Sequence, residues 1–394
     1  METAGGQVAE AHSQKKESPD PATFVGKGKA LELAEQVLKH RVQTLVFDDE
    51  LKPVQQRNLE EITGVKVVDR TRLILDIFAQ RARTREGILQ VELAQLDYLL
   101  PRITERFGRF EQQVGGIGTR GPGERKLEVD RRRIRDRIAH LKSLIDRIRE
   151  ERRLQRHPRR SIPVPQVALV GYTNAGKSTL LNALLRSSSG APKAPHHHAY
   201  ADDKLFTTLD PITRRVRLLS GRTILFSDTV GFIRKLPTQL VAAFRATLEE
   251  VAEADLLLLV VDASDPDWAG QLQTVEQVLK ALQVDQLPRL TAYNKMDCLS
   301  PSERALFQRR DGVLISAVSG HRMESLLKAV EERLAHQWVE HEFLFSYQEG
   351  DRIARVREHM DVISLKSTEE GIRVRVRTHP VTLAQWLKSH TAKP

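Results

Sequence analysis

The sequence contains a single cysteine, Cys298, and no run of eighteen consecutive apolar residues along its 394 positions. One thiol excludes an internal disulfide framework, and the lack of a long apolar run excludes a membrane-spanning helix. Residues 1–20 lack the apolar core of a signal peptide and are typical of a disordered, polar lead-in. We therefore expect a protein of the reducing cytoplasm, without a transmembrane segment.

Positive charge is concentrated in one segment, although hydrophobic residues make up an ordinary 40% of the chain. Between Arg120 and Arg160 there are 16 Lys or Arg against 7 Asp or Glu, a net of +9, while the whole chain carries +10. Phosphate-rich partners are the usual reason for such a concentration, because each neutralised phosphate releases counterions. The alternative is a solvated helix with ion pairs four residues apart. The imbalance favours nucleic acid.

Strand and helix patterns predict an α/β protein with three folded parts after the lead-in at residues 1–20. Residues 21–160 alternate short strands with helices and then form a long antiparallel helical hairpin, whose helices carry apolar residues at heptad spacing. Pro101 is expected to kink or interrupt the first of these helices. Residues 161–338 predict a mainly parallel sheet covered on both faces, and residues 339–394 predict a small α+β domain.

The turn of the hairpin, Gly115–Gly123, holds five glycines and one proline in nine residues. Glycine permits positive φ and a close approach of the backbone to another molecule. A floppy tip and a docking element that orders on contact both fit this composition, and the neighbouring basic helix favours the docking element. The candidate RNA-binding residues are Gly115, Gly116, Gly118, Arg120, Gly121, Arg125, Lys126, Arg131 and Arg132.

The strongest motif is Gly171-Tyr-Thr-Asn-Ala-Gly-Lys-Ser178, which lies between an apolar strand at 167–170 and a helix that begins near Lys177. In such a P-loop the backbone amides cradle phosphates, Lys177 neutralises the β and γ oxygens, and Ser178 binds Mg²⁺. Chance is a poor explanation once this strand–helix context is present. The candidate phosphate-site residues are Gly171, Asn174, Ala175, Gly176, Lys177, Ser178 and Thr179.

The next motif, Asp228-Thr-Val-Gly231, follows a strand at 223–226. An aspartate at a strand end that faces the P-loop is suited to hold Mg²⁺ through water, and the Gly231 amide is suited to reach the γ-phosphate. A switch threonine that binds Mg²⁺ must lie between these two motifs. Thr207 and Thr208 are the candidates, and Thr208 is favoured.

Two further loops are expected to read the base. In Asn294-Lys-Met-Asp297, the Asp297 carboxylate offers two acceptors for the N1–H and 2-amino groups of guanine, whereas adenine has neither donor. Lys295 is expected to lie across the base, and Asn294 to brace the loop and the N7 edge. Ser316 and Ala317 are expected to lend a backbone N–H to the guanine O6. Four loops at successive strand ends predict a guanine-nucleotide site.

The segments GYTNAGKST, KLFTTLDP, DTVGFI and NKMD, together with GGIGTRGPGE ahead of them, resemble the HflX family of translation-associated GTPases. The resemblance covers about residues 20–335. It implies a Ras-like G domain, GTP or GDP with Mg²⁺ as ligands, and binding to the large ribosomal subunit and its rRNA. Members are associated with rescuing or splitting stalled ribosomes. The tract at 186–202 is longer than the family leads us to expect; His196, His197 and His198 there are suited to a metal, although a solvated loop is the usual form of such a tract.

Hydrolysis is expected to be slow without a partner, because Phe232 stands where many GTPases carry a water-orienting glutamine. Asn174 resembles the asparagine of potassium-dependent GTPases, so K⁺ is a candidate activator. The candidate catalytic residues are Lys177, Thr208, Gly231 and Asn174.

The sequence predicts a monomeric GTPase that binds the large ribosomal subunit, binds no DNA, and remodels or splits ribosomes. The alternative is a nucleotide-gated RNA-binding module, with chaperone or helicase-like action, in which hydrolysis only resets binding.

Overall fold

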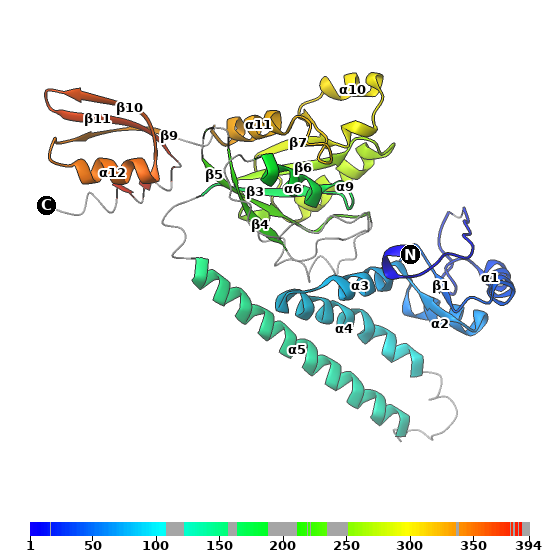
Figure 1. Ribbon diagram of the computed structural model, residues 1–394. Helices are drawn as coiled ribbons and strands as arrows, with labels where there is room; N and C mark the ends of the chain where they lie inside the picture. Colours follow the sequence, from blue (N-terminus) through cyan, green and yellow to red (C-terminus); the bar gives the residue numbers. More distant parts are fainter. Residues whose placement is uncertain are drawn as a thin grey trace. The chain divides into compact units, whose positions relative to one another are not determined.

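The computed structural model describes residues 1–15, 17–107, 122–156, 164–187, 211–218, 220, 222–234, 251–335, 339–378, 380, 383–384 and 386–387. The chain divides into two compact units: one contains Met1–Arg149 together with Asp202–Asp210 and Ile233–Thr247, and the other contains strands β3 to β11 (Figure 1). Each is described by itself below. Within the described ranges, no helix is both long and apolar enough to cross a membrane.

The first unit opens with a small α/β layer. Strands β1 (Thr44–Val46) and β2 (Lys66–Val68) pair in parallel, and helix α2 (Pro53–Thr63) makes the crossover that a parallel pair requires. Helices α1 (Lys27–His40) and α3 (Arg70–Arg81) complete the layer. The buried residues that pack together are Ala30, Leu33, Phe47, Leu51, Leu59 and Val67. The predicted alternation of strand and helix is confirmed here.

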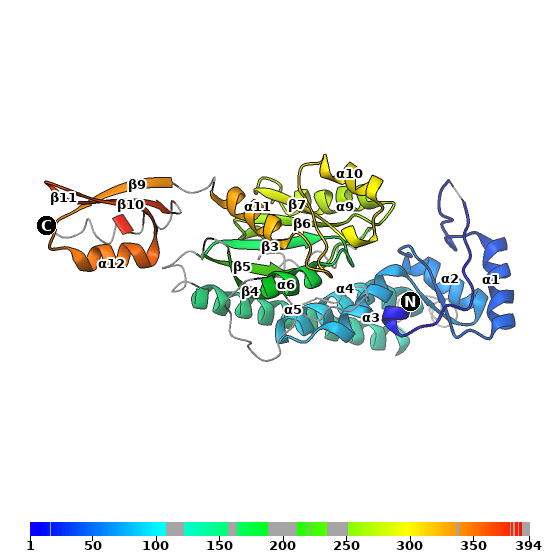
Figure 2. The same cartoon turned by 45° about the horizontal axis from the view of Figure 1, so that its top comes forward.

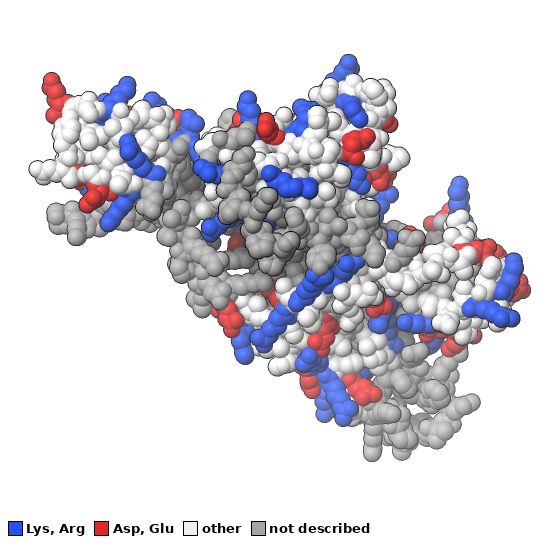
Figure 3. Space-filling model, in the orientation of Figure 1, with Lys and Arg blue, Asp and Glu red and all other residues white. Residues whose placement is uncertain are grey.

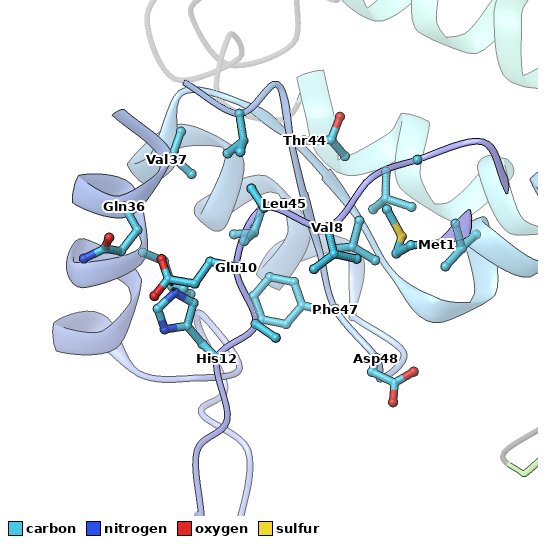
Figure 4. Close-up of a pocket in the computed structure, with 18 of the residues that line it drawn as sticks. Met1, Val8, Glu10, His12, Gln36, Val37, Thr44, Leu45, Phe47 and Asp48 are labelled. Carbon is cyan, nitrogen blue, oxygen red and sulfur yellow. Dashed lines mark ion pairs between the residues drawn. The ribbon is translucent and has the colours of Figure 1, made fainter. Parts of the chain in front are cut away.

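The first residues of the chain lie beside this layer. A short 3-10 helix, η1 (Glu2–Ala4), is followed by an extended segment. Figure 4 shows side chains of this segment, Val8, Glu10 and His12, beside those of α1 and β1. Glu10 Oε2 lies 3.0 Å from His40 Nε2 and 3.5 Å from His12 Nε2. A cavity of about 1460 Å³ is lined by this extended segment together with α1, β1 and α3.

Helices α4 (Arg85–Phe107) and α5 (Pro122–Arg156) form the predicted long pair and run side by side in Figures 1 and 2. Their seam contains the heptad positions of the sequence: Leu89, Leu93, Leu96, Leu100, Ile134, Ile138, Leu141 and Ile145. Arg137 of α5 also donates to both carboxylate oxygens of Glu92 on α4, at 2.8 and 3.0 Å. The apolar stripe of each helix is thus buried by the other.

Helix α4 runs through Pro101 without a break, so of the predicted kink or interruption the interruption is wrong. Both sides of the proline are held by one buried carboxylate, Asp69, which is 0% exposed. Tyr98 Oη donates to its Oδ1 at 2.8 Å, and Arg102 Nη2 donates to its Oδ2 at 3.1 Å. Arg102 Nη1 also donates to the Tyr98 carbonyl at 3.0 Å, in the turn that the proline would weaken. These tertiary contacts offset the cost of the proline.

Asp69 also accepts from the backbone amides of Leu51 at 3.2 Å and Arg72 at 2.8 Å, so it joins the small layer to α4. We expect Asp69→Asn to destabilise this unit by about 3–5 kcal/mol, because an amide replaces the charge that buried donors require. The free energy of unfolding of parent and variant, from denaturant titration, measures this effect. Asp76→Asn is the matched control: its ion pair with Arg72, at 3.1 Å, is a third exposed, so removal should cost under about 1 kcal/mol. Equal losses in both variants would contradict the role of Asp69.

The second unit is built on a six-stranded sheet of order β4-β5-β3-β6-β7-β8, parallel except for the β4–β5 pair. This confirms the mainly parallel sheet. Its strands are β3 (Gln166–Gly171), β4 (Ile212–Arg217), β5 (Thr223–Asp228), β6 (Leu256–Asp262), β7 (Arg289–Asn294) and β8 (Val313–Leu314). Among the described residues, its helices are α6 (Lys177–Ser187), α9 (Trp268–Ala281), α10 (Pro301–Gln308) and α11 (Met323–Ala335).

Helices cover both faces of this sheet (Figures 1 and 2). Successive strand residues point to opposite faces: Val260 packs with residues of α6 and α11, while its neighbour Val261 packs with Phe307 of α10 and Trp268 of α9. Burial on both faces explains why the central strands are continuous apolar runs, such as Leu256–Val261 at 0–5% exposure. All parallel strands end at the same edge, where the predicted motifs lie.

The chain ends in the expected small α+β domain: β9 (Val339–Phe345), α12 (Gly350–His359), β10 (Asp361–Thr368) and β11 (Gly371–Thr378), with sheet order β10-β11-β9. Strand β11 alternates buried Val374 and Val376 with exposed Arg373 and Arg375 and half-buried Arg377. The arginines meet glutamates of β9: Arg375 lies 2.8 Å and Arg377 2.7 Å from Glu340. The basic outer face is therefore partly neutralised.

Candidate nucleotide-binding site

The P-loop connects β3 to α6 with the backbone conformations that such a loop needs. Asn174 is exposed with φ 61°, and Gly176 has φ 90°. Asparagine tolerates the left-handed region better than most residues, and only glycine fits at 176, because an added Cβ would collide with the Asn294 side chain. Gly171 is equally constrained, since a Cβ there would strike the Val260 carbonyl of the neighbouring strand. The loop thus approaches other backbone closely.

Lys177 is the first residue of α6 and is only 7% exposed. Its ammonium donates to the carbonyls of Gly171 at 3.2 Å and Tyr172 at 3.0 Å, so it is held against the loop. Burial lowers the pKa of Lys177 to about 8, an effect that Asp228 opposes. A phosphate anion placed here would stabilise the charged form of a lysine that burial otherwise disfavours.

Ser178 and Asp228 supply the oxygens of a candidate Mg²⁺ site. Ser178 Oγ donates to Asp228 Oδ2 at 2.6 Å, which joins the start of α6 to the end of β5. Asp228 is 0% exposed. A hydroxyl and a carboxylate in direct contact form an all-oxygen donor set, as Mg²⁺ prefers, and Mg²⁺ binds through one or two carboxylates together with phosphate oxygens. These residues therefore fit the ion.

The Asp228–Gly231 loop is fastened to the P-loop by backbone hydrogen bonds. Phe232 N donates to the Gly171 carbonyl at 3.1 Å, and Thr173 N donates to the Phe232 carbonyl at 2.8 Å. A Cβ on Gly231 would lie 2.7 Å from Thr173 Cα and 3.0 Å from Lys177 Nζ, so only glycine brings this amide beside the lysine. The Phe232 ring is 2% exposed. It is packed inside the protein and has no group that could orient water.

Asn294, at the end of β7 and 2% exposed, links three of the four loops. Its Nδ2 donates to the Ala175 carbonyl of the P-loop at 2.9 Å, and its Oδ1 accepts from Ala317 N at 2.9 Å. These two bonds hold the base loop in place, while a contact of Asn294 with the N7 edge of guanine stays a prediction. Ser316 N donates to the His321 carbonyl at 3.2 Å, so both amides named for the guanine O6 have acceptors within the protein. A guanine O6 would have to exchange one of these bonds.

Asp297 lies in the short helix η4 (Met296–Cys298) that follows Asn294. A hydrogen bond from the Ser316 side chain is the main cause that lowers the pKa of Asp297, so its carboxylate stays charged. Cys298 Sγ donates to Asp297 Oδ2 at 3.5 Å. Desolvation and this bond raise the pKa of the Cys298 thiol, which disfavours the thiolate and any nucleophilic role.

Asp262, at the end of β6, is a contact that the sequence reasoning did not identify. Its Oδ2 lies 2.7 Å from Lys295 Nζ, and Lys295 has φ 63°. Asp262 Oδ1 accepts from Ser264 N at 3.0 Å and Ser264 Oγ at 2.6 Å. The ammonium of Lys295 is thus anchored, which fixes the direction of its aliphatic stem. The sequence feature that could have identified Asp262 is an acidic residue at the carboxyl end of a parallel strand.

Several other predicted site residues lie outside the part of the chain that the structure describes. Thr207, Thr208 and His196 to His198 lie outside the described residues. So do Gly115, Gly116, Gly118, Arg120 and Gly121, while Arg125 and Lys126 belong to α5 without described side chains. Thr179 is half-buried in the first turn of α6. Among described residues, no group of three His, Cys, Asp or Glu side chains is arranged to hold a metal.

Side chains of α5 carry both signs of charge. Arg132, Arg133 and Arg135 are exposed and Arg131 is half-buried, but Asp136 and Glu128 are exposed as well. On the face seen in Figure 3, blue and red side chains are interspersed. The described part of α5 is therefore a mixed surface with a cluster of arginines from 131 to 135.

Family models match most of the chain. A model described as "GTP-binding GTPase N-terminal" matches residues 1–79, and "GTP-binding GTPase Middle Region" matches residues 81–159. A third, "50S ribosome-binding GTPase", matches residues 166–295, which include the P-loop, the Asp228–Gly231 loop, Asn294 and Lys295.

Curated relatives are similar over more than four fifths of their length. GTPase HflX of Caldanaerobacter subterraneus subsp. tengcongensis is 48% identical over 375 residues, covering 95% of this chain and 84% of the relative. GTPase HflX of Magnetococcus marinus is 45% identical over 97% of this chain and 87% of its own length. GTPase HflX of Escherichia coli is 43% identical over 89% and 81%. The chain therefore belongs to the HflX family of GTPases.

Proposed function

We propose that this GTPase binds the large ribosomal subunit and uses GTP to remodel or split stalled ribosomes. The observation that carries the proposal is the match of residues 166–295, which include the P-loop and the Asp228–Gly231 loop, to a family described as 50S ribosome-binding GTPases. The arginine cluster on α5 supports a contact with rRNA phosphates. Within this proposal the protein acts as a monomer in the cytoplasm and does not bind DNA.

Within this site, each loop has one task. The P-loop amides and Lys177 bind the phosphates, and the Gly231 amide orients the γ-phosphate. Asp297 binds the edge of the guanine. Asn294 holds the base loop against the P-loop and the Ala317 loop through its two 2.9 Å hydrogen bonds. Because the Phe232 ring is buried, no side chain at that position orients the attacking water. Turnover is therefore slow until the partner completes the site.

Two ions belong to the proposal. Ser178 and Asp228, with Thr208 as a further ligand, would hold Mg²⁺, which would neutralise charge at the phosphates. K⁺ is proposed beside Asn174, whose exposed side chain at φ 61° lies on the rim of the P-loop. In this role K⁺ would take the place of an arginine finger.

The experiment is GTP turnover with and without purified 50S subunits, in K⁺ and in Na⁺ buffer. We expect strong stimulation by the subunits, and faster turnover in K⁺. Arg132→Glu should weaken subunit binding and reduce the slope of log affinity against log salt by about one to two, because a phosphate contact becomes a repulsion. Lys280→Glu on α9 is the matched control, because it makes the same charge change at another exposed position.

The outcomes separate the two candidate functions. Stimulation that Arg132→Glu weakens and Lys280→Glu preserves supports the ribosomal function. Affinity for naked RNA without stimulation supports the nucleotide-gated RNA-binding module. Equal rates in K⁺ and Na⁺ would remove K⁺ from the proposal and leave the rest intact.

A further inference from the structure

The two outer edges of the small β1–β2 sheet differ. At the edge of β2, both backbone groups of Val67 are bonded by side chains of α2. Its N–H donates to Glu60 Oε1 at 3.3 Å, and its carbonyl accepts from Gln56 Nε2 at 2.9 Å. These side chains occupy the backbone groups that a further strand would need, so the β2 edge is closed to pairing.

The outer edge of β1 has no such cover among the described residues. Phe47 N donates to the Val68 carbonyl at 2.9 Å, so Leu45 and Phe47 direct their backbone groups towards β2. Because alternate residues of a parallel strand bond to opposite sides, Thr44 and Val46 direct their N–H and C=O groups away from β2. Within the described ranges no backbone hydrogen bond reaches these groups. They are a template on which another strand can pair.

The cavity of about 1460 Å³ lies beside this edge, with Val46 and residues of two helices in its walls. Figure 4 shows Val37 of α1 with Leu45 and Phe47 of β1 around it. Leu45 and Phe47 pack on the α1 side of the sheet, so Val46 points to the other face. Leu73 of α3 lines the cavity as well. A strand added beside β1 would therefore have a helix over each face.

This position in the fold defines the chemistry of its occupant. A strand with a helix over each face is a continuous apolar run, because both sets of side chains are buried. The chain's own extended segment beside the cavity does not fit, since it carries Gln7, Glu10 and His12 and its Val8 is 59% exposed. Its contact from Glu10 to His40, at 3.0 Å, is between side chains 43% and 34% exposed. Such a contact holds the segment only weakly.

We propose that the β1 edge and the cavity beside it form a docking site for an extended, apolar segment of a partner polypeptide, which joins the β1–β2 sheet as a third strand. The backbone groups of Thr44 and Val46 pair with the segment, and the apolar side chains of α1 and α3 bury its side chains. None of these residues belongs to the nucleotide loops, so the site acts without GTP.

The probe is a fluorescent, lysine-capped peptide of six alternating valines and isoleucines, titrated against the full chain without nucleotide or ribosomes. The comparison peptide has the same side chains but is methylated at each central backbone nitrogen, which removes its donors. We expect saturable binding of the first and at least about tenfold weaker binding of the second, because each lost backbone hydrogen bond weakens binding several-fold. Hydrogen exchange should show that the amides of Thr44 and Val46 become protected only with the first peptide.

Val46→Pro removes an N–H that faces the cavity and leaves the bonds of Leu45 and Phe47 to β2 in place, as proline at a sheet edge does. It should weaken the first peptide at least about tenfold. Val46→Ala is the matched control, because it keeps the N–H; its affinity should stay within about threefold of the parent. GTP turnover should be unchanged in both variants. If Val46→Pro does not fold, the two peptides on the parent protein still decide.

Four results would overturn the proposal. The first is no saturable binding of the unmethylated peptide, and the second is equal affinity for both peptides, which would mean apolar adhesion without strand pairing. The third is protection of the Thr44 and Val46 amides in the free protein, which would show that the chain's own residues pair with β1. The fourth is a concentration-dependent dimer that Val46→Pro abolishes, which would make a second copy the occupant. None of these measurements depends on the large subunit.

Discussion

Replacing Asp297 by Asn should reverse the base preference from guanine to xanthine, with a change of about 10⁴ in the ratio of the two affinities. The parent carboxylate has two acceptors for the N1–H and 2-amino donors of guanine. The amide of asparagine turns one acceptor into a donor, which faces the guanine donor but suits the 2-oxo group of xanthine. A site whose groups hydrogen-bond one ligand binds a mismatched ligand more weakly by a factor of this order, because buried polar groups are left without partners.

The measurement is the affinity for GDP and for xanthosine diphosphate in both proteins. The introduced amide would retain an oxygen for the Ser316 side chain that holds Asp297, so the loop is expected to keep its place. Asp311→Asn is the control: this aspartate is 89% exposed and pairs with Arg333 at 3.2 Å, away from the base loops. If Asp297→Asn still preferred GDP by orders of magnitude, the assignment of the base site would be wrong.

The fold of the central domain could be predicted from the sequence because its signals are local. Apolar runs such as Leu256–Val261 mark strands buried on both faces, and the motifs fall directly after them. The heptad residues of α4 and α5 also predicted their common seam, since Leu93 and Leu141 do pack in one cluster. These features depend on periodicity, which a single sequence displays.

Features that depend on distant contacts were missed. The continuity of α4 through Pro101 rests on Asp69, which lies 33 positions before its partner Arg102, and no local pattern announces that contact. The partial neutralisation of the arginines on β11 likewise requires the pairing of β11 with β9, which places Arg375 opposite Glu342 and within reach of Glu340. Proline propensity and charge alternation are weak guides when tertiary packing decides the result.

At the nucleotide site, the sequence predicted which residues meet but not how they are held. Ser178 and Asp228 are in contact as expected. The role of Asn294 as a bridge between Ala175 and Ala317 was expected only in part, because the partners of a buried amide depend on the relative position of three loops. The anchoring of Lys295 by Asp262 has the same origin.

Replacing Lys177 by Ala should lower GTP turnover by about 10²–10³, because it removes a preorganised cation from the position where charge develops on the phosphates. The ammonium is buried, and its pKa of about 8 shows that burial already disfavours its charge in the nucleotide-free protein. That cost is recovered only when phosphate binds. The free energy of unfolding of the nucleotide-free protein should consequently change little. The only loss expected there is that of the hydrogen bonds from Lys177 to the carbonyls of Gly171 and Tyr172.

The same variant decides whether turnover measured with large subunits belongs to this protein. Ribosome preparations carry other GTPases, so stimulated turnover alone does not identify the enzyme. If Lys177→Ala, with its melting temperature within a few degrees of the parent, loses the stimulated rate, the hydrolysis occurs at this P-loop. Lys280→Ala, which removes an exposed lysine of α9, should keep the full rate. A Lys177→Ala protein that hydrolyses GTP within tenfold of the parent would show that Lys177 does not stabilise the transition state, because loss of one such donor is worth about 2.7–4 kcal/mol elsewhere.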